Sequence, residues 1–131
     1  MFSLTPARLL SAFIFFGAVA VNAQDQSDMT YNGAAFYYET NATQTGACGY
    51  QDTNNSTAAS VNCLLIQNNP NLCACNAVVT LADGTTHPVP IHDCFTDPKF
   101  TIGFTPGEFQ RLNNNQLGTM QNVSWTPVPS S

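Results

Sequence analysis

The stretch GACGYQD, residues 46–52, carries the most information about the fold of this chain, and two further pieces follow it at fixed positions. The first is VPIHDC, residues 89–94, which ends a run of strand-forming residues in an aspartate and a cysteine. The second is TPGEF, residues 105–109. It predicts the start of a helix, because Thr105 can cap the first turn, Pro106 suits the first helical position and Glu108 completes a capping box.

The first 23 residues have the pattern of a secretory signal peptide. Arg8 precedes an almost unbroken apolar run at residues 9–20, and Val21-Asn22-Ala23 supplies small residues where the peptidase would cut. The alternative is a membrane anchor, but a spanning helix needs roughly 20 apolar residues, and the chain turns polar at Gln24. We therefore expect a secreted, extracellular protein whose mature chain begins at Gln24 and has no membrane association.

The mature chain, residues 24–131, is long enough for one small domain, since domains cluster near about 100–150 residues. We expect that domain at residues 24–126 and a flexible tail at 127–131. Without Arg8 the chain keeps two basic residues against eight acidic ones, a net charge of −6. Such an acidic protein should not bind nucleic acid, whose affinity for proteins comes largely from Lys and Arg on phosphates.

The mature chain contains five cysteines, and a secreted domain of this size usually oxidises its cysteines to disulfides. Because five is an odd number, one cysteine is left over, so we expect a monomer or a covalent dimer joined through that residue. Cys73-Ala74-Cys75 could instead belong to a zinc site, but structural zinc prefers about two to four residues between paired cysteines and no matching second pair exists. We expect no metal and no cofactor. The disulfide candidates are Cys48, Cys63, Cys73, Cys75 and Cys94.

Four Asn-X-Ser/Thr sequons begin at Asn41, Asn54, Asn55 and Asn122. In a secreted eukaryotic protein such sequons mark surface positions that can carry N-linked glycans. Asn54 and Asn55 are adjacent, so both are not readily modified in one molecule. The sequence therefore predicts a glycoprotein if the source is eukaryotic.

Short apolar segments interrupted by Gly, Pro, Asn and Asp predict a small all-β domain. We expect strands at residues 34–39, 58–66, 76–81, 86–92 and 120–126, the second of them a strand or a strand leading into a turn. Asp83-Gly84 predicts the turn of a hairpin, because this pair tolerates the positive φ angles that such turns need. We expect a helix that begins at Thr105 and ends by the run of asparagines at residues 113–115.

The order of these pieces resembles the expansin-like double-psi β-barrel over residues 31–126. Residues 33–38 are similar to the family's opening strand, GACGY to its first loop, residues 93–94 to the end of its V-x-D-x-C strand and residues 105–112 to its S-P-x-x-F helix. The family includes expansins, barwin, rare lipoprotein A domains, small single-domain fungal expansin-like proteins, family-45 endoglucanases and a papain inhibitor. The resemblance implies an all-β, six-stranded double-psi β-barrel with one or two short helices and stabilising disulfides.

The resemblance also suggests the disulfide pairing. Cys48 and Cys94 lie at the ends of family motifs that meet in the barrel, so we expect a bridge between them. The second bridge would then join Cys63 to Cys73 or Cys75.

Asp93 matches an aspartate of the family's groove, but three other groove positions differ. The family's second acid, in a D-L-S-P pattern, is Gly103, its opening-strand threonine is Phe36, and its groove tyrosine is Phe95. Cleavage of a glycosidic bond normally needs a general acid and a second carboxylate, so these departures argue against hydrolysis and we assign no catalytic residue. Asp93 keeps two interpretations, a binding acid of the groove or a loop cap that accepts backbone N–H bonds.

We expect the groove to bind cell-wall polysaccharide without hydrolysing it, since flat aromatic rings with polar edges suit stacking on sugars. For each aromatic residue the alternative is a place in the core. Positions five apart on one strand face opposite ways, so His87 and His92 cannot readily bind one metal ion. His92, next to Asp93, has the better case for the groove. The expected groove residues are Tyr38, Tyr50, Asp52, His92, Asp93 and Phe95.

Two other functions remain open on the same barrel. One is a protein-binding module, either a cysteine-protease inhibitor or a secreted effector or defence factor. The other is a glycoside hydrolase with relocated acids, for which Glu39, Asp52 and Asp97 are available near the expected groove.

Overall fold

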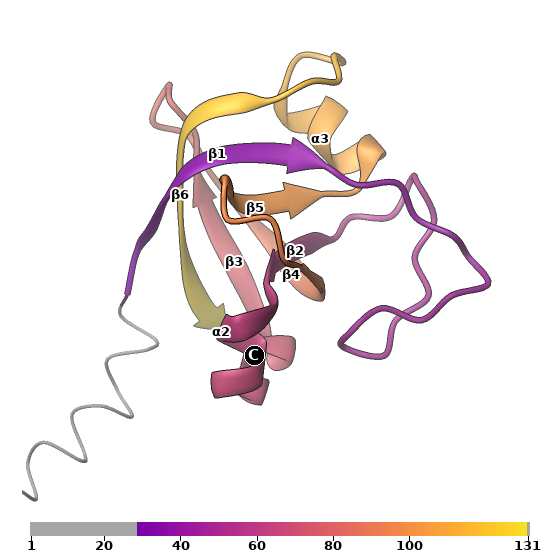
Figure 1. The fold of residues 1–131 in the computed structure, drawn as a ribbon. Helices are drawn as coiled ribbons and strands as arrows, with labels where there is room; N and C mark the ends of the chain where they lie inside the picture. Colours follow the sequence, from indigo (N-terminus) through magenta and orange to yellow (C-terminus); the bar gives the residue numbers. More distant parts are fainter. Residues whose placement is uncertain (1–28, 131) are drawn as a thin grey trace, which may run out of the picture.

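In the computed structural model, residues 29–130 are described, so the predicted signal peptide lies outside the described residues. These residues form a closed barrel of six strands with three short helices (Figure 1). The barrel order is β1-β5-β2-β4-β3-β6, which confirms the prediction of an all-β, six-stranded fold. The elements are β1 (Tyr31–Tyr37), β2 (Ala59–Asn62), α2 (Cys63–Asn68), the 3₁₀ helix η1 (Pro70–Ala74), β3 (Cys75–Thr80), β4 (Thr86–Phe95), β5 (Phe100–Phe104), α3 (Pro106–Leu112) and β6 (Met120–Pro129).

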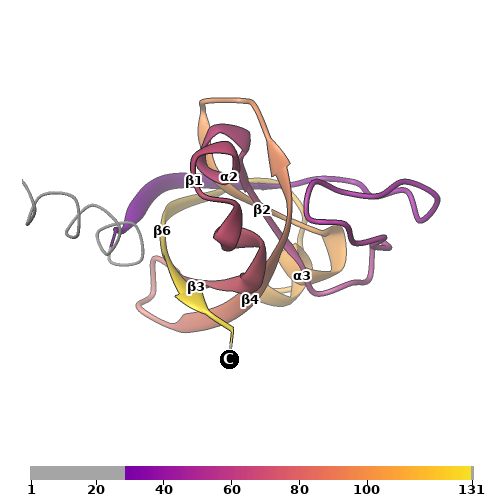
Figure 2. The ribbon, with the colours of Figure 1, turned by 90° about the horizontal axis from the view of Figure 1, so that it is seen from below.

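Two parallel strand pairs give the barrel its crossed topology. β1 pairs with β5, and β2 pairs with β4, whereas the other neighbours are antiparallel. β5 therefore lies between β1 and β2, and the chain connects those two strands by a long loop, residues 38–58. This loop projects from one side of the barrel, as the two perpendicular views show (Figures 1 and 2).

Alternate residues of the strands fill the interior of the barrel. Val89 and Ile91 of β4 are buried, as are Val123 and Trp125 of β6. This pattern arises because successive side chains of a strand point to opposite faces. The indole N–H of Trp125 donates a hydrogen bond to the carbonyl oxygen of Thr101 at 3.0 Å. Trp125 thus lies in the core with its one polar group satisfied.

The strand predicted at residues 58–66 is divided in the structure, because β2 ends at Asn62 and α2 begins at Cys63. The side-chain oxygen of Asn62 accepts a hydrogen bond from the backbone N–H of Leu64 at 2.9 Å. This contact is a helix N-cap, for which asparagine is among the preferred residues. The apolar run after Cys63 favoured a longer strand, but the cap at Asn62 starts a helix instead.

β6 continues to Pro129, which corrects the predicted flexible tail at residues 127–131. Pro127 lies opposite Ala77, and Pro129 lies opposite Cys75 of β3. The pairing of β6 with β1 ends at Trp125, so both prolines lie where only one edge of β6 is paired. Proline lacks an N–H donor but is tolerated at such an edge position.

α3 begins at Pro106 as predicted, but the expected capping box does not form. The hydroxyl of Thr105 donates to the carbonyl oxygen of Ser56, and Thr105 makes no side-chain cap contact. Glu108 is buried and forms an ion pair with Arg111, whose Nε donates to Glu108 Oε1 at 3.0 Å. The Glu108 carboxylate thus pairs with Arg111, three residues later on the same helix, and does not cap the start of α3.

The disulfides differ from the expected pairing, because Cys48 is bonded to Cys73 and Cys63 to Cys94. The parallel register of β2 and β4 sets Val61 opposite Cys94. Cys63, two residues further along, therefore comes close to Cys94, with Cα atoms 4.7 Å apart.

The position of Cys48 explains the second bridge. Its backbone N–H donates to the carbonyl oxygen of His92 at 3.1 Å. Cys48 therefore lies beside His92 of β4, and His92 precedes Cys94 by two residues. From there Cys48 reaches Cys73 in η1, with Cα atoms 5.4 Å apart. Cys75 remains a thiol. Two disulfides agree with an extracellular location, because such bonds persist in oxidising environments.

Candidate functional site

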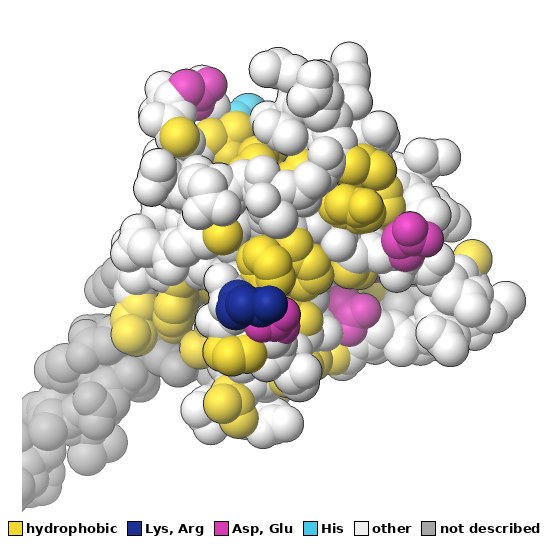
Figure 3. All heavy atoms as spheres, turned by 45° about the horizontal axis from the view of Figure 1, so that its top comes forward, with side chains coloured by type: hydrophobic (Ala, Val, Ile, Leu, Met, Phe, Trp, Pro, Cys, Tyr) yellow, Lys and Arg dark blue, Asp and Glu magenta, His cyan; other side chains and the backbone are white. Residues whose placement is uncertain are grey.

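A cleft of about 130 Å³ lies between the β1–β2 loop and the end of β4. It contains four of the six expected groove residues, and we call it the loop cleft. Figure 3 shows several hydrophobic patches on one face of the molecule, with acidic side chains at separate places between and around them. The loop cleft is lined by Tyr38, Glu39, Thr40, Asn41, Gln44, Thr45, Gly46, Tyr50, Asp52 and Asp93.

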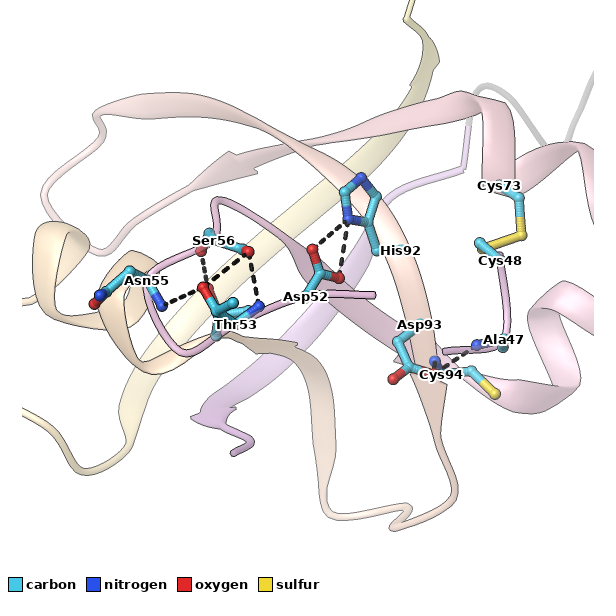
Figure 4. Close-up of polar contacts among 11 residues, drawn as sticks. Ala47, Cys48, Asp52, Thr53, Asn55, Ser56, Cys73, His92, Asp93 and Cys94 are labelled. Atoms are coloured by element: carbon cyan, nitrogen blue, oxygen red, sulfur yellow. Dashed lines mark hydrogen bonds and ion pairs between the residues drawn. A yellow bond between two sulfur atoms is a disulfide. The ribbon is translucent and has the colours of Figure 1, made fainter. Parts of the chain in front are cut away.

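Asp93 fixes the GACGY part of the loop to β4. Its Oδ1 accepts hydrogen bonds from the backbone N–H groups of Ala47 at 2.9 Å and Cys94 at 2.8 Å (Figure 4). A Cβ atom at Gly46 would lie 2.8 Å from the carboxyl carbon of Asp93, so only glycine permits this close approach. Asp93 therefore caps a loop and also lines the loop cleft, which combines the two interpretations that the sequence left open.

Asp52, His92 and Tyr50 form a layered unit beside Asp93. Both oxygens of Asp52 lie 3.1 Å from His92 Nδ1 (Figure 4), and both side chains are largely buried, with exposed fractions of 13% and 16%. The ring of Tyr50 stacks on the imidazole with centroids 3.7 Å apart and planes at 8°. Tyr50 itself is 45% exposed. His92 thus supports Tyr50 from behind and does not line the loop cleft.

Tyr38 supplies the inner wall of the loop cleft. Its hydroxyl is buried and has no hydrogen-bond partner among the described residues. Burial, and then the negative charges of Asp93 and Asp52, raise the pKa of this phenol well above its ordinary value. The phenol therefore stays protonated, and its hydroxyl is buried behind the wall of the loop cleft.

No family model matches the chain, and no curated protein matches it. Solved structures do match. The chain superimposes on the Streptomyces papain inhibitor with a TM-score of 0.63 and 23% identity, over 76% of this chain and 94% of the inhibitor. It superimposes on an expansin of Clavibacter michiganensis with a TM-score of 0.61 and 19% identity, over 79% of this chain and 52% of the expansin. A mutant of that expansin in complex with cellohexaose gives the same values.

The fold is the expansin-like double-psi β-barrel. The chain spans about half the length of the expansin and nearly the whole inhibitor. At identities of 23% and 19%, the likeness shows the fold and does not identify a ligand for the loop cleft.

The expansin-like barrel of this chain has an aromatic cluster where the resemblance implied polar groove residues. Phe36 lies opposite Gly103 in the β1–β5 ladder. The ring of Phe36 is 4.9 Å from that of Phe95 and 4.7 Å from that of Phe100. A Cβ atom at position 103 would lie 2.8 Å from the Phe36 ring. The Phe36 ring thus occupies the space that a side chain at position 103 would need.

The structure therefore separates the predicted groove residues into three groups. Tyr38, Tyr50, Asp52 and Asp93 line the loop cleft, and His92 lies behind Tyr50. Phe95 does not line it and packs on Phe36 instead. Their participation in binding stays a prediction.

Sequence reasoning did not single out residues 40–45 as part of the site, apart from the sequon at Asn41. These residues lie in the projecting loop, and their polar composition was typical of any solvated loop. Asn54 Oδ1 accepts hydrogen bonds from the backbone N–H and the hydroxyl of Thr40, at 2.8 and 2.9 Å. That cross-tie between distant loop positions has no signature in the sequence.

Between residues 29 and 130, no cluster of three or more His, Cys, Asp or Glu side chains is arranged to hold a metal ion. In the same part of the chain, no helix is long and apolar enough to cross a membrane.

Proposed function

We propose that this protein is a secreted, non-hydrolytic binder of extracellular polysaccharide that uses the loop cleft. The observation that carries this proposal is the exposed ring of Tyr50, held flat against His92 at 3.7 Å. One face of the ring is covered by the imidazole, and the other is available to a ligand. Because the Asp52–His92 contact holds the ring in place, stacking on it costs little side-chain entropy.

The remaining lining of the loop cleft suits a polyhydroxylated ligand. Carboxylates of Asp52, Asp93 and Glu39 accept hydrogen bonds, and the amide side chains of Asn41 and Gln44 both donate and accept. A ring face beside such groups is a combination that recognises sugars by stacking and hydrogen bonding together. An expansin of the same fold is known in complex with cellohexaose, which supports a carbohydrate of this class.

The absence of hydrolysis in this proposal rests on Gly103. A glycosidase normally uses two carboxyl groups on opposite sides of the scissile bond. At position 103 the Phe36 ring leaves no space even for a methyl group, so no second acid can be supplied from β5. The Asp93 carboxylate is committed through Oδ1 to two backbone N–H groups.

A second candidate function is protein binding through the projecting loop. This loop, residues 38–58, extends beyond the barrel (Figure 2). Most of its residues are exposed, so a partner protein could contact their side chains. The chain also covers 94% of the length of a papain inhibitor with the same fold. An inhibition assay against a papain-type cysteine protease separates this candidate from polysaccharide binding.

The test of the main proposal is retention of the mature chain, residues 24–131, on insoluble cellulose, chitin and peptidoglycan. Tyr50→Ala should weaken binding roughly 2- to 10-fold, which corresponds to the ~0.5–1.5 kcal/mol of an aromatic stack. Leu117→Ala is the matched control, because Leu117 is exposed at 43% and does not line the loop cleft. Absence of retention on all three materials, or equal loss in both variants, would count against a sugar site at Tyr50.

A further inference from the structure

Asn41 combines a modification motif with a place in the site. It begins the sequon Asn41-Ala42-Thr43, is exposed and lines the loop cleft together with Asp52 and Asp93. The sequons that begin at Asn54, Asn55 and Asn122 contribute no asparagine to that lining. Asn41 is therefore the sequon whose modification would change the cleft directly.

Hydrogen bonds hold Asn41 at the wall of the cleft. Its Oδ1 accepts from the backbone N–H of Thr43 at 3.0 Å and from the Thr43 hydroxyl at 2.7 Å. Its carbonyl oxygen accepts from the backbone N–H of Gln44 at 2.8 Å. The preceding residue, Thr40, is tied to Asn54 through two hydrogen bonds. A group attached to Asn41 Nδ2 would consequently begin at a fixed point beside the cleft.

We propose that Asn41 carries an N-linked glycan that covers the mouth of the loop cleft and restricts which ligands reach Tyr50 and the carboxylates. The inference rests on the proposed secretion and on the proposed role of the loop cleft. In the modification, Asn41 Nδ2 forms a bond to C1 of a lipid-pyrophosphate-linked oligosaccharide. The bond from C1 to the pyrophosphate oxygen breaks, the lipid pyrophosphate leaves and one amide proton is released.

Size and chemistry both support a covering effect. The loop cleft is only about 130 Å³, so a bulky branched glycan anchored in its wall is large relative to the opening. Sugar hydroxyls near Asp52 and Asp93 would also find hydrogen-bond acceptors there. The glycan should therefore hinder long or branched ligands more than a single terminal sugar.

The first measurement is site occupancy in the full chain produced by a eukaryotic secretory host. Mass spectrometry of the peptide that contains Asn41 should show a glycan that disappears in Asn41→Gln and persists in Thr43→Ser. Asn122→Gln removes a sequon away from the cleft and serves as the matched control. An unmodified Asn41 in the secreted wild-type protein would overturn the proposal.

The second measurement needs no polysaccharide ligand. Carbodiimide-driven coupling of a bulky amine to Glu39, Asp52 and Asp93, read by peptide mass, should be several-fold faster in Asn41→Gln than in the wild type or in Asn122→Gln. An endoglycosidase that trims each glycan to one sugar should produce the same acceleration in the unmutated chain, which avoids any effect of the substitution on folding. Equal labelling rates before and after trimming would refute the covering role. If labelling accelerates but neither form binds cellulose, chitin or peptidoglycan, this inference stands and the proposed polysaccharide function fails.

Discussion

Replacing Gly103 with alanine should destabilise the barrel through one identifiable contact. The added Cβ would lie 2.8 Å from Cε1 and Cζ of Phe36 and 3.2 Å from Cδ1 of Tyr38, whereas carbon atoms pack best at roughly 3.5–4.0 Å. The Phe36 ring cannot swing aside without cost, because Phe95 and Phe100 lie against it at 4.9 and 4.7 Å. The new methyl group must therefore displace several rings at once.

The expected loss follows from the usual cost of overpacking, about 1–3 kcal/mol. Alanine normally gains up to ~1 kcal/mol over glycine in a strand because it restricts the unfolded chain, so the measured loss is a net value. We expect Gly103→Ala to lower the free energy of unfolding by a net ~1–2 kcal/mol. On a domain of this size each kcal/mol lowers Tm by roughly 4–8 °C, so the midpoint should fall by roughly 4–16 °C.

A double-mutant cycle with Phe36→Ala isolates the cause. Once the ring is gone, the methyl group at position 103 has space, so Gly103→Ala should cost little in that background. The coupling free energy should be ~1–2 kcal/mol, within the ~0.5–3 kcal/mol seen for residues in contact. The assay is equilibrium unfolding in urea of the wild type, both single variants and the double variant, with the disulfides intact.

Val128→Ala provides the control partner for the same cycle. Val128 is exposed on β6 and pairs with Asn76 of β3, so its effect should add to that of Gly103→Ala within ~0.3–0.5 kcal/mol. If Phe36→Ala and Gly103→Ala are equally additive, the Phe36 ring does not exclude a side chain at position 103. The structural explanation of the missing groove acid would then be wrong.

Three further predictions concern Tyr38 and the cysteines. Tyr38→Phe removes a buried hydroxyl without a partner and should leave stability equal or up to ~1 kcal/mol higher at pH 7. Folding raises the pKa of this phenol above its ordinary value of 10.0, so the wild type should keep its full stability below about pH 10 and lose stability as the pH rises further. Urea unfolding between about pH 9 and pH 11.5 should show a smaller loss in Tyr38→Phe. Cys75→Ser should abolish the single thiol titrated in denaturant, and any thiol that remains in the variant would contradict the assigned bridges. In the folded wild type the Cys75 thiol should react slowly, since burial raises its pKa. Removing the Cys48–Cys73 bridge by Cys48→Ala with Cys73→Ala should lower the free energy of unfolding by ~2–4 kcal/mol, and an unchanged urea midpoint would contradict a stabilising role.

The sequence predicted the barrel because local signals and the order of motifs agreed. Asp83-Gly84 forms the turn between β3 and β4, with Gly84 at a φ of 88°, as the hairpin signal requires. The helix after Thr105 also begins where Pro106 indicated. Such signals depend on residues within a few positions of one another, which a single sequence displays directly.

Errors arose where a residue had more than one possible partner and the folded structure decided between them. The pairing of Cys63 with Cys94 follows from the β2–β4 register, which no local pattern specifies. Glu108 satisfied every local requirement of a capping box, yet the tertiary position of α3 buried it beside Arg111. In each case the residue has a different partner from the one that the local pattern predicted, namely Cys94 for Cys63 and Arg111 for Glu108.

The candidate site shows the same division between local and long-range information. The motif containing Asp93 placed this residue at the cleft, but its two hydrogen bonds from the loop and β4 depend on the close approach that Gly46 permits. His92 and Phe95 were expected to face a ligand, and the fold uses them as support for Tyr50 and Phe36 instead. Sequence position identified the neighbourhood, whereas side-chain packing decided which rings are available.

The loss of the groove acid cannot be reversed at one position. An aspartate at 103 would force a charged group against the half-buried Phe36 ring, and burying an unpaired carboxylate is strongly unfavourable. Replacing Phe36 by threonine as well would open space, but it would also remove the ring on which Phe95 and Phe100 pack. The aromatic cluster and Gly103 therefore form one cooperative unit that excludes an acid at this position of β5. The loop cleft that we propose as the binding site, with Tyr50, Asp52 and Asp93 in its wall, draws none of its lining from β5 and so does not depend on an acid at position 103.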